Sequence, residues 1–193
     1  LAIPLFWTVL PKAGNSNQYE RIALMQMFIE CYGVDKIKFL TADREFKGAI
    51  WLKWLTLMGI NFRIRIPNNT QVNNRFRNKM ISITKLFCGL KIGEVMTLNK
   101  AYKIWGTWVY VSATRSITGE YVIVISNENT PNILEDYRKR WSIETLFSAL
   151  KIRGFNLEDT HLTQPDRISK LFAIVTLAFV WCYRVGLWQS GVK

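Results

Sequence analysis

Apolar residues in the first part of the chain fall into runs with strand or helix spacing. Residues 1–10 are mostly apolar and predict a buried strand that is already under way where the chain starts. Asn17 then offers a helix N-cap with Glu20 as its capping-box partner, and apolar residues at helical spacing follow as far as Gly33. We therefore expect a strand and then a helix that ends at this glycine.

The next segment predicts a strand, a helix and another strand. A short apolar strand over residues 36–42 brings Asp43 to its carboxyl end. Residues 46–58 have a helical pattern, and residues 60–66 alternate between apolar side chains and arginines, as a half-buried strand does. This order of elements, with a carboxylate at a strand end, is typical of an α/β protein.

Residues 95–126 differ in character from the segments before them. They are rich in β-branched and aromatic residues and are punctuated by Gly106 and Gly119, which predicts a small antiparallel meander. From Thr130, an N-cap candidate followed by Pro131 at the first helical position, helical periodicity continues to about residue 150.

A last helix is expected over about residues 166–188. The longest apolar stretch within it, residues 171–183, is shorter than the ~20 residues that a membrane span needs. We therefore expect this helix to be buried in the protein.

Charge adds a candidate partner to this picture. The chain has 26 Lys and Arg against 14 Asp and Glu, a net charge of +12, which favours a polyanion such as nucleic acid or an anionic membrane surface. No acidic residue occurs between Phe46 and Gly93, where the basic residues are Lys47, Lys53, Arg63, Arg65, Arg75, Arg77, Lys79, Lys85 and Lys91. We interpret this stretch as a DNA-binding track in which Arg75, Arg77 and Lys79 take part. The alternative is a solvated basic loop without a function.

Composition excludes several other classes of protein. Hydrophobic residues make up 49% of the chain, which is too many for a disordered or collagen-like sequence. His161 is the only histidine and no C-x-x-C pair occurs, so a zinc site is not expected. The three cysteines are far apart, as in a cytoplasmic protein with reduced thiols.

The most informative stretch is residues 137–151. On a helix advancing about 100° per residue, one face within roughly a 100° arc would present Tyr137, Arg140, Trp141, Glu144 and Lys151. The carboxylate can hold a divalent metal ion, the cations can hold phosphates, and the indole can stack on a base. An exposed helix with ordinary ion pairs is the alternative.

The spacing of the tyrosine, arginine, glutamate and lysine in this stretch resembles the signature of insertion-sequence transposases of the DDE class, in the subgroup named for its Tyr-Arg-Glu-Lys motif. Residues 41–46 resemble the segment around that family's second catalytic aspartate. Residues 154–162 resemble the stretch that follows its lysine, and residues 3–16 resemble the strand and loop before its first helix. The resemblance covers nearly the whole chain.

The resemblance implies an α/β fold of the RNase H-like type. In this fold a mixed sheet has flanking helices, and a β-rich insertion precedes the helix that carries the catalytic glutamate. The resemblance implies a single truncated catalytic domain over residues 1–193, with a basic loop and the insertion at about residues 67–127. Its first strand or strands, with the first catalytic aspartate, would precede residue 1.

The implied activity is DNA transposition, with metal-dependent cleavage and strand transfer at transposon ends in a cut-and-paste reaction. In the family, two aspartates and a glutamate hold two Mg²⁺ or Mn²⁺ ions, and Asp43 and Glu144 match the second aspartate and the glutamate. Glu20 and Asp35 are poor substitutes for the first aspartate, because one fits a capping box and the other precedes a strand. We therefore expect the chain alone to be an inactive fragment.

The resemblance also implies DNA contacts. Tyr137, Arg140 and Lys151 would contact phosphates near the transposon end, and Trp141 would stack on a base displaced from the duplex. Arg44 could contact the phosphate backbone or pair with a neighbouring acid.

Trp105 or Trp108 could add a second stacking surface, or both could pack within the meander. The expected partner is double-stranded DNA, bound by a homodimer in the bacterial cytoplasm without membrane association. Two alternatives remain: a non-catalytic DNA-binding remnant of a transposase, and a protein that binds a membrane surface through its basic face and its C-terminal apolar helix.

Overall fold

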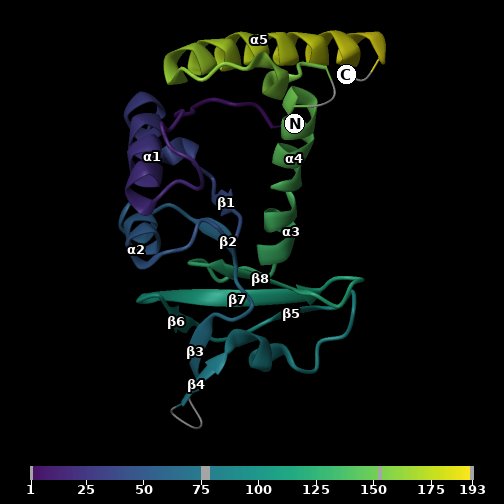
Figure 1. The fold of residues 1–193 in the computed structure, drawn as a ribbon. Helices are drawn as coiled ribbons and strands as arrows, with labels where there is room; N and C mark the ends of the chain where they lie inside the picture. Colours follow the sequence, from purple (N-terminus) through teal and green to yellow (C-terminus); the bar gives the residue numbers. More distant parts are fainter. Residues whose placement is uncertain (1, 75–78, 152–153, 192–193) are drawn as a thin grey trace. The chain divides into compact units, whose positions relative to one another are not determined.

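Residues 2–74, 79–151 and 154–191 are described by the structure, a computed structural model, and they form two units (Figure 1). The sheet unit is Asn15–Arg140. The helical unit joins Leu1–Gly14 to Trp141–Lys193.

A mixed β-sheet organises the sheet unit. Among the described residues its main path runs in the order β1, β2, β8, β7, β5, and β6 pairs with β7. The strands are β1 (Leu40–Ala42), β2 (Phe62–Ile66), β5 (Val95–Thr97), β6 (Tyr102–Ile104), β7 (Thr107–Arg115) and β8 (Tyr121–Ser126). Strands β1 and β2 are parallel and the other pairs are antiparallel, so the predicted α/β class and the antiparallel meander are confirmed.

Helices cover both faces of this sheet. The main core lies on one face, where α2 (Ala49–Leu57) packs against β7 and α1 (Gln18–Tyr32) packs against α2. On the other face α3 (Ile133–Arg138) packs over Val124 of β8. Because successive strand residues point to opposite faces, Ile123 and Ile125 join the first core while Val124 joins the second.

Local signals in the first helix predict its bounds well. Asn17 Oδ1 accepts hydrogen bonds from the Tyr19 and Glu20 amides, and Glu20 Oε2 accepts one from the Asn17 amide at 2.7 Å, which completes the capping box. The helix ends at Gly33, whose φ of 84° suits glycine. A short 3₁₀ helix, η1 (Val34–Lys36), precedes β1.

The predicted strand over residues 1–10 is wrong, because no strand forms among the described residues 2–10. Trp7 packs on a helix of its own unit, while Ile3 and Leu5 are exposed. Trp7 Nε1 donates a hydrogen bond to Ser169 Oγ at 3.0 Å, and the Trp7 ring meets the Phe172 ring edge-on at 5.0 Å between centroids. An apolar run alone does not distinguish these two kinds of burial.

The predicted basic loop after residue 67 contains regular structure. Strands β3 (Gln71–Asn74) and β4 (Lys79–Ser82) form an antiparallel hairpin, and η2 (Ile83–Phe87) follows it. Val72 is fully buried, which holds this hairpin against the main core. Residues 75–78 between the two strands, and with them Arg75 and Arg77, lie outside the described residues.

The single helix predicted from Thr130 to about residue 150 is also wrong. Helix α3 begins two residues later than expected, with Asn132 at the N-cap, and α4 (Trp141–Lys151) is a separate helix. Between them the amides of Lys139 and Arg140 bond to carbonyls three residues back, at 3.2 and 3.0 Å. This tight turn interrupts the α-helical ladder at the boundary of the two units.

The helical unit contains α4, the short η3 (Leu157–Thr160) and the long α5 (Pro165–Gln189). Its core includes Leu146 and Leu150 of α4 and Val175 of α5. The prediction that the last helix is buried is wrong: α5 exposes Ile174, Leu177, Trp181 and Trp188. By length and composition alone, α5 is apolar enough to cross a membrane, with a mean hydropathy of 1.8 over a window that is only 11% buried.

A buried arginine connects the sheet to α3. Arg63 is 2% exposed, and its Nη2 lies 2.7 Å from Glu128 Oε2 while its Nε lies 3.5 Å from Asp136 Oδ2. Its Nη1 donates to the Phe62 carbonyl and to Ser126 Oγ, at 3.0 and 2.9 Å. Arg63 therefore serves the fold and is not part of the DNA-binding track in which the sequence placed it.

We expect Arg63→Met to lower the free energy of unfolding of the sheet unit by about 2–3 kcal/mol, because it removes a buried cation that bonds Glu128, Ser126 and the half-buried Asp136, which keeps only its pair with Lys139. Arg65→Met is the matched control on the same strand. Its partner Glu120, at 2.8 Å, is half exposed, so the loss should stay below about 1 kcal/mol. Urea denaturation measures both losses, and equal values would contradict the assignment of Arg63 as the structural anchor.

Candidate functional site

Asp43 lies where the sequence predicts it, directly after β1. Parallel pairing of β1 with β2, with Ala42 opposite Ile64, brings the aspartate to the carboxyl edge of both strands. A turn follows at once, because the Phe46 amide bonds to the Asp43 carbonyl at 2.9 Å. The half-buried Asp43 side chain accepts a hydrogen bond from the Arg44 amide through Oδ1 at 2.7 Å.

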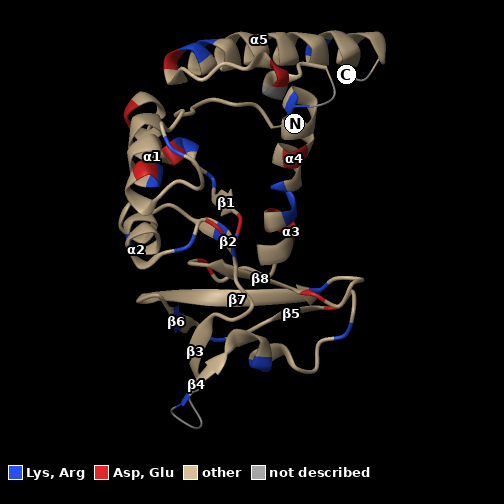
Figure 2. Ribbon diagram, viewed as in Figure 1, with Lys and Arg blue, Asp and Glu red and all other residues tan. Residues whose placement is uncertain are grey.

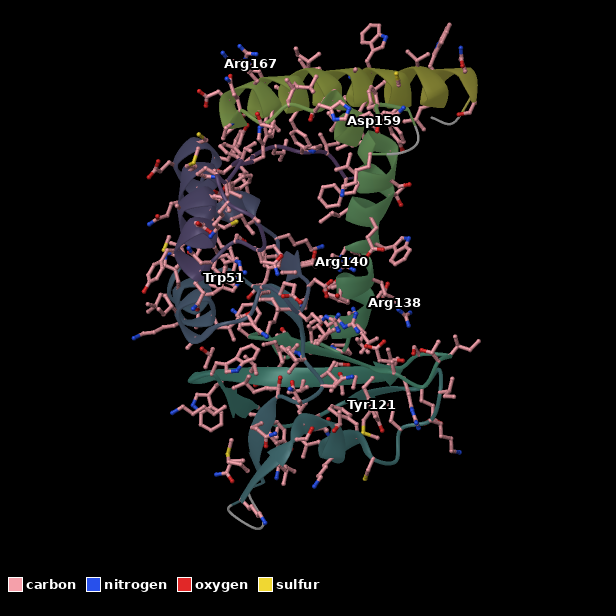
Figure 3. All side chains as sticks on the ribbon, in the orientation of Figure 1. Trp51, Tyr121, Arg138, Arg140, Asp159 and Arg167 are labelled. Atoms are coloured by element: carbon pink, nitrogen blue, oxygen red, sulfur yellow. The ribbon has the colours of Figure 1, made fainter. Side chains whose placement is uncertain are left out.

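Two residues of the predicted signature face meet this carboxylate. Tyr137 on α3 donates a long hydrogen bond through its hydroxyl to Asp43 Oδ1 at 3.5 Å. The same hydroxyl accepts a hydrogen bond from Arg140 Nε at 3.1 Å, and the guanidinium carbon lies 5.5 Å from the tyrosine ring centroid. Figure 3 labels Arg140 at this position, just beyond α3. The structure thus brings Asp43, Tyr137 and Arg140 together as one cluster.

The surroundings of Tyr137 keep its phenol neutral. The side chain is 7% exposed and packs with Ile133 and Leu134 of its own helix against β8. Burial raises the pKa of Tyr137, and the Asp43 carboxylate raises it further, while Arg140 and Arg65 act in the opposite direction. A neutral phenol keeps the proton that it donates to Asp43.

Arg44 and Arg65 line a pocket of about 260 Å³ near Asp43. The remaining lining residues are Ile66, Pro67, Asn68, Asn69 and Glu120. Arg44 Nε lies 3.7 Å from Glu45 Oε1, so the pairing with a neighbouring acid that the sequence allowed is present, in an exposed form. The sequence did not predict Arg65 as a residue of this site. The alternation in residues 60–66 does place its side chain on the same face of the sheet as that of Arg63, and α3 covers this face.

The other three residues of the predicted face, which include the glutamate and the lysine of the signature, lie on α4 in the helical unit. Trp141 is 66% exposed, Glu144 is half-buried in the first turn, and Lys151 is the last residue of the helix. They share one face of α4 by helical spacing, while Leu146 and Leu150 are buried in the core of the unit. The approach of Glu144 to Asp43 stays a prediction.

The residues fit a divalent metal ion in the type of their ligands. Carboxylate oxygens are the ligands that Mg²⁺ and Mn²⁺ prefer, and the side chains of Asp43 and Glu144 are of this type. In the described part of the chain, no three His, Cys, Asp or Glu side chains gather into a metal-binding group. Glu20 is engaged as a helix cap, as the sequence indicated, and Asp35 pairs with Lys36 at 3.1 Å.

The two tryptophans of the insertion differ in exposure. Trp105 packs against the main core and, with Gly106, forms the two-residue turn between β6 and β7; both have positive φ, 46° and 86°. Trp108 is 58% exposed beside it. Both line a groove of about 580 Å³ with Ala49, Ile50, Lys53, Thr56, Leu57, Gly106 and Thr107. Packing within the fold therefore describes Trp105 better than Trp108.

Part of the predicted basic track lies on the hairpin of the sheet unit and on η2, and its role in DNA binding stays a prediction. Figure 2 shows basic residues on β4 and η2 and no acidic residue on β3, β4 or η2, and Lys79 at the start of β4 is exposed. A strand-end carboxylate beside arginines, together with a stretch that has basic and no acidic residues, suits a phosphate polymer such as nucleic acid.

Comparison with known proteins identifies the family. The model of the transposase DDE domain matches residues 8–181. Because this match spans most of the chain, the chain belongs to the transposase DDE domain family. No curated protein matches it at a significant level. The family consists of transposases, which act on DNA in transposition and generally use divalent metal ions.

Proposed function

We propose that the chain is the catalytic part of a transposase of the Tyr-Arg-Glu-Lys subgroup, with an RNase H-like fold, that cuts and joins DNA at transposon ends. The observation that carries this proposal is the cluster of Asp43, Tyr137 and Arg140 at the carboxyl end of β1. Tyr137 and Arg140, two of the four signature residues, thus lie close to the strand-end aspartate, although they are distant from it in sequence.

Asp43 and Glu144 would hold the metal ions. When bound, two such ions activate a water or a 3′-hydroxyl group and stabilise the oxygen that leaves the phosphorus. The side chains of this chain would bind and orient the DNA. Arg140 and Lys151 would bind phosphates beside the cleaved bond. The exposed Trp141 indole would stack on a base displaced from the duplex.

Two carboxylates are too few for this chemistry, because they leave two cations poorly neutralised at about 3.5–4 Å from one another. We therefore propose that the 193-residue chain binds DNA weakly and does not nick it in Mg²⁺ or Mn²⁺. A third carboxylate supplied from upstream sequence would complete the site. The complete protein would act as a homodimer on paired transposon ends in the bacterial cytoplasm.

A structure of the chain bound to DNA and Mn²⁺ would test this function directly. We expect the Asp43 and Glu144 carboxylates to lie roughly 4–8 Å apart, because both must reach the same one or two metal ions. A separation beyond about 15 Å in that complex would contradict the assignment of these two residues as one site.

A non-catalytic DNA-binding remnant is the second candidate function. Among the residues that the structure describes, no three His, Cys, Asp or Glu side chains form a metal-binding group, as would be the case in such a remnant. DNA cleavage by a longer protein that also carries the third carboxylate distinguishes the two candidates. If that protein binds transposon ends and never cuts them, the remnant is the correct description.

A further inference from the structure

Helix α5 presents an exposed apolar face in the helical unit. Ile174, Trp181 and Trp188 follow one another at intervals of seven residues, and Leu177 lies three residues after the first of them. The four side chains are between 65% and 81% exposed. A seven-residue repeat of apolar residues is the spacing with which one α-helix packs along another, so this face suits a second helix.

A groove of about 880 Å³ lies beside this face. Its walls include Ile3 and, on α5, Thr176, Trp181, Arg184 and Trp188. Thr176 is 7% exposed, and its Oγ1 has no hydrogen-bond partner in the part of the chain that the structure describes. A buried hydroxyl without a partner is unfavourable, so the groove calls for an apolar occupant that also carries a polar group.

The exposed apolar surface has the area that a dimer interface needs. An aromatic side chain has about 150–250 Å² of surface, so the two indoles and the two aliphatic side chains together offer on the order of 500 Å². Ile3, at 44% exposure, and the groove walls extend this surface towards the ~800 Å² that each partner buries in a stable interface. The largest apolar patch on a typical monomer is only about 300–600 Å².

We infer that this face binds a second copy of the chain, with the two α5 helices packed antiparallel across a two-fold axis near Ala178. In such a contact both copies use the same surface. Trp181 of each copy enters the groove of the other, and its indole N–H donates to the Thr176 hydroxyl, which gives both groups a partner. The small side chain of Ala178 allows the helices to approach closely at the axis.

The same register avoids repulsion along the seam. It sets Arg184 opposite Ala173 and Lys170 opposite Leu187, so no two like charges face each other. Over longer distances two copies that each carry a net charge of +12 repel, and salt screens this repulsion. Association should therefore strengthen with salt, whereas binding to DNA or to an anionic membrane weakens.

Sedimentation equilibrium of the full chain without DNA provides the first test, and it is independent of the proposed function. We expect a dimer whose dissociation constant falls severalfold between about 0.1 and about 0.5 M NaCl. Trp181→Ala should raise this constant at least about thirtyfold, as the loss of a buried aromatic anchor does. Trp108→Ala removes an indole that is 58% exposed on the sheet unit, and this matched control should leave the constant within about twofold.

Two results would overturn the inference. One is an equal effect of the two tryptophan substitutions. The other is a wild-type chain that stays monomeric. If that monomer binds vesicles of phosphatidylcholine and phosphatidylglycerol in low salt, the face belongs to an anionic membrane.

A double-mutant cycle tests the pairing of Trp181 with Thr176. Thr176→Val keeps the shape of the side chain and should raise the dissociation constant about fivefold. It should not lower the urea midpoint of the monomer, where the hydroxyl has no partner. Trp181→Phe removes the indole N–H, and the double variant should lose less affinity than the product of the two single factors. Independent factors would overturn the pairing and the register built on it.

Cross-linking tests the direction of packing. The native cysteines Cys31, Cys88 and Cys182 are exposed, so they are first replaced by serine. Ala178→Cys in this background should cross-link to its copy with a short bismaleimide. Ser190→Cys should not, because twelve residues of helix place it about 18 Å from the axis. Cross-linking of both cysteines would indicate parallel helices, and cross-linking of neither would exclude the contact; each result overturns the inference.

Discussion

Glu144→Gln, in a protein extended upstream to supply the third carboxylate, is expected to lower metal-dependent DNA nicking by at least about a thousandfold. The substitution removes the negative charge of the proposed metal ligand and keeps the shape of the side chain. It leaves Arg140 and Lys151 in place, so DNA affinity should change by less than about twofold. Nicking of a labelled duplex that carries the element end, together with anisotropy on the same duplex, measures both quantities.

Glu135→Gln is the matched control for this experiment. Glu135 is an exposed acid in the first turn of α3, so the substitution makes the same change of charge away from the site, and nicking should continue. Two results would contradict the assignment. One is equal loss in the two variants, and the other is cleavage by the isolated chain that survives Asp43→Asn.

Replacing Arg75, Arg77 and Lys79 together with glutamine is expected to flatten the salt dependence of DNA binding by up to about 3 units of slope. Each cation that neutralises a phosphate releases about one counterion, so three lost contacts lower the slope by that amount. The affinity in roughly 100 mM salt should fall about 10- to 100-fold. The affinity of the chain for a duplex, measured by anisotropy over a series of salt concentrations, gives the slope.

A second triple variant separates a local effect from a loss of net charge. Lys36, Lys38 and Lys100 are exposed and lie outside the acid-free stretch, and replacing them with glutamine removes the same total charge. We expect this control to change the slope by less than one unit. If both triple variants flatten the salt dependence of DNA affinity, or if neither does, the hairpin has no specific role in DNA binding.

The parts of the site that depend on short-range signals could be predicted from the sequence. Asp43 lies at a strand end because a short apolar strand and a turn are both encoded within a few residues. The capping box at Asn17 and the meander have equally local origins. The approach of Tyr137 and Arg140 to Asp43 agrees with the resemblance, since a motif records residues that share a site.

Other features depend on contacts that no local pattern contains. Arg63 belongs to a basic stretch by sequence, yet Glu128 and Asp136, more distant in the chain, make it a buried anchor. The helical periodicity continues through residues 137–141, while hydrogen bonds to carbonyls three residues back end one helix and start another. In the first residues, Ser169 and Phe172 of α5 provide the packing that an apolar run would otherwise find in a sheet.

The pairing of β2 with β8 has a consequence for how the chain folds and how it tolerates change in length. Ile66 lies opposite Ile123 in the sheet. In sequence these two residues are separated by a long segment that contains the β3–β4 hairpin and strands β5, β6 and β7. The entropy lost on closing such a loop grows slowly, by about 0.6 kcal/mol for each doubling of its length. Insertions or deletions at the hairpin tip should therefore alter equilibrium stability little. The closure acts mainly on kinetics: the local β7–β8 ribbon can form early, while β2, and with it the strand end that carries Asp43, joins the sheet late.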